Sequence, residues 1–171
     1  LLCGGRNVGK SSFARYLVNR ALSAAPGGAP VCFLDTDVGQ AELGAPGLVA
    51  LHVLGAPLLG PPHTHLRHPS SARFIGDVSP AAHPTAYVAA IAALLDETRS
   101  RAAADDDATS PPRVPPLLIN TCGWVSGLGA QLLADILSAA QPTHVANHDH
   151  RDQPLKYLTL PDSLFPPTRL P

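Results

Sequence analysis

The sequence predicts an α/β fold with a mainly parallel central sheet, and three observations carry this prediction. Short, continuously apolar segments alternate along the chain with segments whose apolar residues recur at helical spacing. The apolar segments do not alternate with polar residues, which is typical of strands covered on both faces. Hydrophobic residues make up 45% of the chain, which is enough for one sizeable core. Together these observations favour a sheet with helices packed against it.

The composition excludes several classes of protein. The 171 residues correspond to about one domain, and the 14 glycines and 19 prolines predict long loops. This composition is unlike that of collagen, a coiled coil or a wholly disordered chain. Because the chain has no methionine, we expect it to be part of a longer protein. No apolar run approaches the roughly 18 residues of a membrane span, so we predict no membrane association.

The net charge bears on the kind of partner, and the cysteines bear on the cellular compartment. The formal net charge is −1, whereas domains that hold nucleic acid mainly by charge are basic. Any role on nucleic acid must therefore depend on a local site. Cys3, Cys32 and Cys122 form no C-x-x-C pair and lie in apolar segments. They predict reduced, buried thiols in an intracellular protein.

The first half of the chain predicts one helix and several strands. An apolar stub over 1–3 is followed by a glycine-rich turn, and a helix follows that turn because Phe13, Leu17 and Ala21 lie four residues apart. This helix is expected to stop near 25–28, at Ala-Pro-Gly-Gly. We predict strands over 31–34, 47–54 and 72–76, with a loop rich in proline and histidine over 55–70.

The second half of the chain repeats the alternation. Pro84 suits the first position of a helix, and residues 101–116 lack periodicity and predict a flexible insertion. A strand is expected over 117–121, a helix over 128–137 that is stopped by a proline, and a last strand over 143–146. We therefore predict a core domain over 1–146 and a proline-rich tail over 147–171, where a lid or C-terminal region would start.

A phosphate-binding loop follows the first apolar stub. Residues 4–11 match G-x-x-x-x-G-K-[ST] between a strand and an amphipathic helix, the context this motif requires. Its backbone N–H groups form an anion-binding concavity, and the helix N-terminus adds a positive dipole end. Lys10 is expected to reach the terminal phosphates and Ser11 to bind Mg²⁺. The fold is therefore predicted to be a P-loop NTPase-type three-layer sandwich, with its first strand truncated at the N-terminus. The residues predicted to hold the nucleotide are Gly4, Gly5, Arg6, Asn7, Val8, Gly9, Lys10, Ser11 and Ser12.

Two carboxylates follow the next strand and are candidates for the metal or the attacking nucleophile. Asp35 and Asp37 come at its C-terminal end, the edge of the sheet where the phosphate loop also lies. They point to opposite sides of an extended chain, so at most one faces the nucleotide directly. We favour Asp37, because Gly39 and Gln40 follow it and free the backbone there. Loop capping is the alternative for either carboxylate.

The strand at 117–121 ends in a segment that carries no acid. Residues 120–124 read Asn-Thr-Cys-Gly-Trp, which makes the earlier pair of aspartates more important. Thr121 is predicted to offer a hydroxyl near the γ-phosphate, and Gly123 to allow close approach. Trp124, the only tryptophan, either lines the site or packs in the core. No guanine-recognition motif is present, so ATP is the default nucleotide.

The histidines leave three interpretations open. His63, His65 and His68 lie in one loop, and His148 and His150 form a second pair. Zinc could accept such ligands, but no cysteine or paired acid accompanies the first cluster. Solvent-exposed loop side chains are one alternative. Contact with a substrate phosphate or ribose is the other.

Taken together, the motifs resemble the RNA polynucleotide 5′-hydroxyl kinases, and within them the branch that processes pre-ribosomal RNA in the nucleolus. The resemblance spans about residues 4–145, which is most of the chain. DVGQ–PG and NT-x-GWV are its specific parts, and GPP-x-TH-x-R and PTHV favour the nucleolar branch. The segments that carry it are GGRNVGKSSFARYLVN (4–19), FLDTDVGQAELGAPGLVAL (33–51), LGPPHTHLRHP (59–69), FIGDVSP (74–80), LLINTCGWVSGLGAQLLADIL (117–137) and PTHV (142–145).

This resemblance implies transfer of the γ-phosphate of ATP to the 5′-hydroxyl of an RNA end, or of a DNA end, with Mg²⁺ as cofactor. Lys10 would bind the β- and γ-phosphates, and Asp37 would orient or activate the acceptor and join Ser11 at the metal. Gln40 would lie near the metal or its waters. Thr121 to Trp124 would help to hold the phosphates, and His65 and Arg67 would touch the RNA end.

The resemblance also implies the setting. It predicts a nuclear, nucleolar protein with a pre-rRNA endonuclease partner and a lid carrying arginines, which no segment here matches clearly. Two alternatives remain open, a catalytically silent ATP-binding scaffold of an RNA-processing complex and a kinase acting on small molecules or nucleotides. Because the first strand is so short, we expect the 171-residue chain alone to be poorly stable and inactive.

Overall fold

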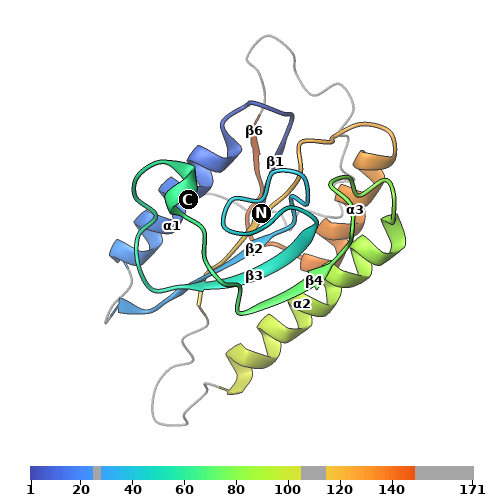
Figure 1. Ribbon diagram of the computed structural model, residues 1–171. Coiled ribbons are helices and arrows are strands. Elements are labelled where there is room, and N and C mark those ends of the chain that lie inside the picture. The colour runs from blue at the N-terminus through green and yellow to red at the C-terminus, as the bar shows by residue number, and fades with distance from the viewer. Residues whose placement is uncertain (25–27, 105–114, 149–171) are drawn as a thin grey trace, which may run out of the picture.

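The computed structural model describes residues 1–24, 28–104 and 115–148, and these form a six-stranded sheet with helices on both faces (Figure 1). Most of the predicted insertion and nearly all of the predicted tail lie outside the described residues. The strands are β1 (Leu2–Gly4), β2 (Val31–Asp35), β3 (Leu48–Leu54), β4 (Ser71–Phe74), β5 (Leu117–Asn120) and β6 (Ala146–His148). The helices are α1 (Lys10–Ala24), α2 (Pro84–Ala104), α3 (Leu128–Ala140) and the short 3-10 helix η2 (Pro62–Thr64).

The sheet is mainly parallel, as predicted. Its strand order is β4-β3-β2-β5-β1-β6. The strands β2, β5, β1 and β6 run parallel to one another, whereas β3 and β4 form an antiparallel edge. The phosphate-loop strand β1 lies between β5 and the edge strand β6, and its C-terminal end opens at the same edge of the sheet as the C-terminal ends of its parallel neighbours. This is the place where ligands bind in open α/β sheets.

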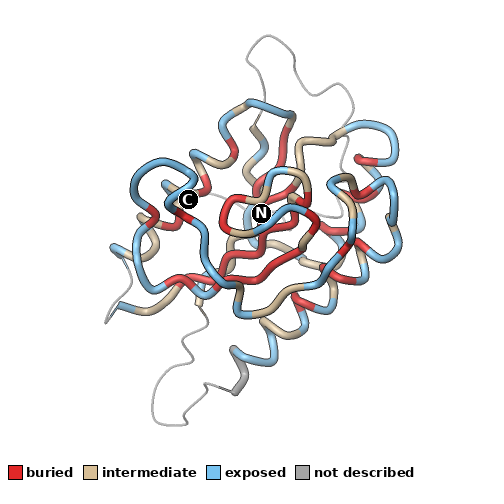
Figure 2. Tube along the Cα trace, in the orientation of Figure 1, coloured by how far each residue is buried: buried red, intermediate tan, exposed pale blue. Residues whose placement is uncertain are grey.

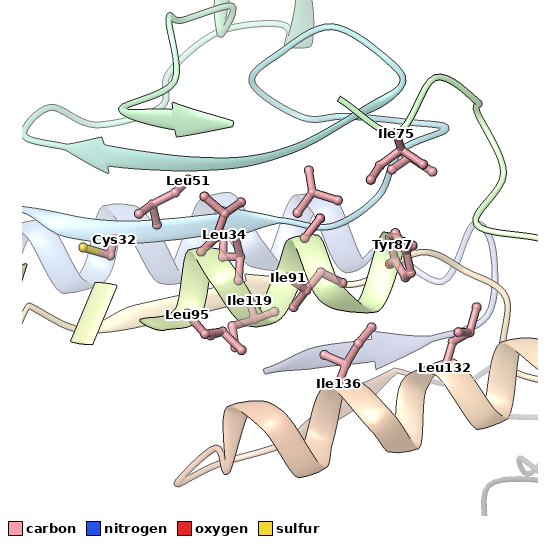
Figure 3. Close-up of a cluster of buried hydrophobic side chains, with 14 residues drawn as sticks. Cys32, Leu34, Leu51, Ile75, Tyr87, Ile91, Leu95, Ile119, Leu132 and Ile136 are labelled. Atoms are coloured by element: carbon pink, nitrogen blue, oxygen red, sulfur yellow. The ribbon is translucent and has the colours of Figure 1, made fainter. Parts of the chain in front are cut away.

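Strand β2 explains why the apolar segments are continuous. All five of its residues are buried (Figure 2). Successive side chains belong to different clusters. Val31 and Phe33 pack with α1 on one face, whereas Cys32 and Leu34 pack with α2 and α3 on the other. Figure 3 shows the second cluster between the sheet and these two helices. The chain is therefore a three-layer sandwich, and the fold prediction is confirmed.

Two predicted boundaries are wrong. Residues 101–104, assigned to the insertion, continue α2, because Arg101 donates to Glu97 one turn earlier at 2.8 Å and supports the helix there. The last strand is Ala146–His148 rather than 143–146, because its register pairs Ala146 with Leu2 and His148 with Gly4. It therefore crosses the predicted boundary between core and tail. In the part of the chain that the structure describes, no helix is long and apolar enough to cross a membrane.

Candidate functional site: a phosphate-loop cleft

A cleft of about 630 Å³ opens at the C-terminal edge of the parallel strands. The phosphate loop and the start of α1 form one wall. The loop after β2 forms the opposite wall, and the segments after β4 and β5 complete it. The lining residues are Arg6, Asn7, Gly9, Lys10, Ser11, Ser12, Asp37, Gly39, Gln40, Val78 and Gly123. The cleft therefore combines residues from both candidate motifs of the sequence.

The phosphate loop turns between β1 and α1 through backbone conformations that are rare for ordinary residues. Asn7 has φ 60° and Gly9 has φ +91°, both in the left-handed region. Gly4 lies against the backbone carbonyl of His148, where a Cβ would overlap with it. Because Ser11 and Ser12 of the first turn of α1 line the cleft, the helix begins at the place predicted to hold anions.

Lys10 and Arg6 are the cationic side chains that line the cleft, and Lys10 is held in place by the phosphate loop. Its ammonium donates to the carbonyls of Gly4 at 3.0 Å and Gly5 at 2.7 Å, which pins the side chain along the loop. Burial lowers the pKa of Lys10 from its ordinary value, and the carboxylate of Asp37 offsets part of this shift. The wall that carries the phosphate loop therefore has a partly desolvated positive charge opposite a carboxylate.

Asp37 is the carboxylate of the cleft. Its Oδ1 accepts hydrogen bonds from the backbone N–H groups of Gly39 at 3.2 Å and Gln40 at 3.0 Å. This local turn is typical of aspartate, and it fixes the side chain beside Gln40 on the cleft wall. The structure thus brings Lys10, Ser11, Asp37 and Gln40 to one cavity, as their predicted roles require.

Asp35 has a different place. It is 1% exposed, and its Oδ2 accepts from the N–H of Glu42 at 2.7 Å. Its Oδ1 accepts from the side-chain amide of Asn120 at 3.0 Å and from the N–H of Asp37 at 3.3 Å. Burial raises the pKa of Asp35 to about 6, although the hydrogen bonds act in the opposite direction. Asp35 therefore holds the ends of β2 and β5 and the loop beyond them, and it does not line the cleft.

Thr121 does not lie where the sequence predicted, and Trp124 takes the core-packing alternative. Thr121 is buried, and its Oγ1 donates to the carbonyl of Leu2 at 2.9 Å, so it joins β5 to β1 and does not line the cleft. Trp124 packs against α3, where a Cβ on Gly129 would overlap with it. Of this segment only Gly123 lines the cleft, and a Cβ there would approach Cγ of Arg6 to 2.7 Å.

The histidine loop also differs from the predictions. His63 and His68 are exposed, but His65 is 1% exposed, and its Nδ1 lies 3.2 Å from Oε1 of Glu42. A side chain so deeply buried cannot touch an RNA end in this conformation, so the prediction of direct contact is wrong for His65. Arg67 is exposed and does not line the cleft. Among the residues that the structure describes, no group of three or more His, Cys, Asp or Glu could hold a metal ion.

Several residues that support the site were not predicted from the sequence. The hydroxyl of Tyr87 in α2 donates to the carbonyl of Thr36 at 2.8 Å, and Thr36 donates twice to the carbonyl of Asn120. Glu42 is 8% exposed and binds both His65 and Arg15. Asn120, a polar residue at the end of a buried strand, was the one signal in the sequence for this network.

Comparisons with known proteins agree with this geometry. The family model described as "mRNA cleavage and polyadenylation factor CLP1 P-loop" matches residues 4–162. The chain belongs to this CLP1 P-loop family. A chain in the solved structure of a Clp1p–Pcf11p complex superposes on this one with a TM-score of 0.70 at 16% identity, covering 96% of this chain and 41% of that chain. This likeness confirms the fold.

Curated relatives of this chain include polynucleotide 5′-hydroxyl-kinases. The chain is 36% identical to NOL9 of Homo sapiens over 145 residues, which are 85% of this chain and 18% of the relative. It is 34% identical to grc3 of Schizosaccharomyces pombe over 154 residues, which are 89% of this chain and 20% of the relative. The resemblance predicted from the motifs is confirmed. The chain spans about a fifth of the length of the curated relatives it matches.

Proposed function

We propose that this chain is the phosphoryl-transfer core of an ATP-dependent polynucleotide 5′-hydroxyl kinase acting on RNA ends. The observation that carries the proposal is the shared cleft, in which Lys10 and Ser11 of the phosphate loop face Asp37 across one cavity. A phosphate loop supplies the nucleotide site. A carboxylate on the opposite wall supplies what a hydroxyl acceptor needs.

The wall that carries the phosphate loop binds the nucleotide and neutralises the charge of its phosphates. The backbone N–H groups of the loop and the start of α1 bind phosphate oxygens, and Lys10 neutralises charge on the β- and γ-phosphates. Ser11 and Asp37 bring a hydroxyl and a carboxylate to the same cleft, the oxygen donors that Mg²⁺ prefers, so the residues present fit this cofactor. Mg²⁺ would supply charge neutralisation between the phosphates.

The acceptor side orients the nucleophile. The 5′-oxygen of the polynucleotide forms the new bond to the γ-phosphorus as the bond to the β–γ bridging oxygen breaks, and ADP leaves with that electron pair. Asp37 accepts the hydroxyl proton or aligns the oxygen for in-line attack. Gln40, beside it on the wall, holds water near the reacting phosphate.

The relatives suggest the wider setting. Their names describe polynucleotide 5′-hydroxyl-kinases, and the structural neighbour is a complex of Clp1p with Pcf11p. By extension, we infer that this chain acts in pre-rRNA processing in the nucleolus beside an endonuclease partner. Co-purification of the natural full-length protein, followed by identification of nuclease subunits, tests this part.

The decisive experiment is transfer of ³²P from [γ-³²P]ATP to an oligoribonucleotide with a 5′-hydroxyl. We expect the natural full-length protein to label it. Asp37→Asn should lower the rate by at least about 100-fold, because it removes acceptor activation. Measured without Mg²⁺, the ATP Kd should change by less than about threefold in Asp37→Asn, because binding then depends on the phosphate loop. Asp96→Asn, an exposed change in α2, is the matched control and should transfer at the normal rate.

The same experiment separates the alternatives. An ATP-binding scaffold would bind ATP with no transfer, and it would keep its partners in the Asp37→Asn form. That outcome is worth testing because the structural neighbour is itself part of an assembly. A small-molecule kinase would prefer nucleosides when nucleosides and oligonucleotides compete as acceptors. ATP binding without transfer to any acceptor would contradict the proposed function.

A further inference from the structure

We propose that Glu42 is a positioning residue that couples the phosphate-loop helix to the wall carrying Asp37. This inference rests on the proposed function in assigning an acceptor role to that wall. Glu42 lies in the segment between β2 and β3 and does not line the cleft. It acts through the residues that it holds.

The carboxylate of Glu42 joins two elements at one oxygen. Its Oε1 accepts from Nη1 of Arg15 at 2.8 Å and lies 3.2 Å from Nδ1 of His65. Arg15 is on α1, little more than one turn beyond Lys10, and His65 ends the η2 segment. The exposed fractions of the side chains are 23% for Arg15, 6% for Glu42 and 1% for His65. Glu42 therefore connects the helix of the phosphate loop to the end of η2.

The backbone of Glu42 is tied to the acceptor wall. Its N–H donates to Oδ2 of Asp35, and Oδ1 of Asp35 accepts from the N–H of Asp37. The loop between these points carries Asp37 and Gln40. Leu43, the next residue, is fully buried, and its carbonyl accepts from the N–H of Arg67 at 2.8 Å. Both ends of the loop are thus fixed, one at β2 and the other at Glu42.

Burial gives this arrangement its rigidity. A carboxylate out of water is stable only with donors or cations around it, and loss of one partner of a buried charged pair is more costly than loss of a surface pair. Arg15 and His65 supply those contacts for Glu42. When phosphate binding orders the start of α1, Arg15 moves with the helix and Glu42 transmits this constraint to the loop of Asp37.

The first arm of the test measures catalysis in the natural full-length protein. Glu42→Ala should lower kcat by about tenfold or more, because a small misplacement of an acceptor group is costly. The ATP Kd should change by less than about threefold, because the phosphate loop remains intact. Glu42→Gln keeps an oxygen acceptor and should recover most of kcat. Glu97→Ala is the matched control, since Glu97 also binds arginines but lies on α2 away from the cleft.

The second arm measures the coupling without any phosphate transfer. Hydrogen exchange with a non-hydrolysable ATP analogue and Mg²⁺ should show protection of the amides of residues 5–11 and of 38–43 in the unchanged protein. Glu42→Ala should keep the protection of residues 5–11 and lose the protection of residues 38–43. If Glu42→Ala fails to fold, Arg15→Met serves as the second variant, because it removes the link between Glu42 and α1 together with one exposed hydrogen bond to Ser12 on the same helix.

The outcomes separate this inference from the proposed function. A protein that transfers no phosphate but loses protection of 38–43 in the variant contradicts the kinase and supports the coupling. Equal protection in the variant and the unchanged protein overturns the coupling even where transfer is normal. A kcat of Glu42→Ala within about twofold of the normal value also overturns the coupling, because misplacement of the acceptor group predicts a loss of about tenfold. Lack of protection at both segments in the unchanged protein overturns both proposals.

Discussion

Gly123 shows how a single residue shapes the phosphate site. A Cβ there would lie 2.7 Å from Cγ of Arg6 and 3.0 Å from its backbone nitrogen, so the chain after β5 can lie against the phosphate loop only as glycine. The sequence predicted close approach at this position. Thr121 was predicted in the site and is not, because its hydroxyl bonds to β1 instead. Trp124 packs against α3, which was the alternative to lining the site.

Gly123→Ala should therefore weaken nucleotide binding. The added methyl group must displace the backbone of the phosphate loop, and we expect the ATP Kd to rise by roughly tenfold, the equivalent of about 1.4 kcal/mol. Isothermal titration calorimetry measures this. Gly55→Ala is the control, because no atom lies within 4 Å of a Cβ at that position. An unchanged Kd for Gly123→Ala would show that the loop tolerates the shift.

His52 is a buried residue whose polarity costs stability. Neither ring nitrogen has a hydrogen-bond partner among the described residues, and the side chain is 1% exposed. Replacement by leucine removes two unpaired polar atoms, so His52→Leu should stabilise the protein by about 1 kcal/mol. Urea unfolding measures this, with the exposed His63→Leu as the control. A less stable His52→Leu protein would mean that the imidazole has a stabilising role there.

At the scale of elements, the ends were harder to predict than the elements themselves. Hydrophobic patterning located the three long helices and five of the six strands, because burial on both faces of the sheet leaves a clear pattern in the sequence. The last strand was misplaced because its position is set by pairing with β1, a contact between distant segments. The antiparallel edge β3–β4 and the burial of His65 depend likewise on tertiary contacts.

We expect the residue that caps the C-terminus of α3 to limit the stability of this helix, which a substitution can test. Gln141 caps this helix in the left-handed conformation, with φ 45° and ψ 56°, and its N–H donates to the carbonyl of Leu137 at 2.9 Å. Glycine adopts this conformation without the steric cost that other residues meet. Gln141→Gly should therefore raise stability by about 1 kcal/mol.

Thermal unfolding compares Gln141→Gly with Ala134→Gly, which lies inside the helix. Ala134→Gly should lower stability by roughly 0.5–1 kcal/mol, because glycine disfavours a helix interior. If both variants lose stability equally, the left-handed cap does not limit the stability of α3.

At the scale of the whole molecule, folding shifts the pKa values of two buried groups in opposite directions. Folding raises the pKa of Asp35 from 3.8 to about 6, so the folded state holds more protons between these values and stability falls as pH rises. Folding lowers the pKa of His52 from 6.5 to about 4, because burial disfavours its cation. The unfolded state then holds more protons in that window, and stability rises with pH.

We expect these opposing effects to leave the unchanged protein with a shallow dependence of stability on pH between about 4 and 6. Each single variant should uncover the other slope. His52→Leu should become less stable as pH rises through this window, and Asp35→Asn more stable, by up to about 1.4 kcal/mol per pH unit. Urea unfolding at several pH values measures both slopes. Parallel slopes in all three proteins would contradict the assignment.

The position of β1 in the sheet also bears on the order of folding. This strand contains only Leu2–Gly4, and its ladder partners are Asn120 on one side and Ala146 to His148 on the other. Pairing across such sequence separations requires closure of very long loops, which slows folding. The hairpin-like edge β2–β3–β4 closes much shorter loops and is expected to form first. The cleft would then be completed late, and a nascent chain would gain the ability to hold a nucleotide only when its sheet closes.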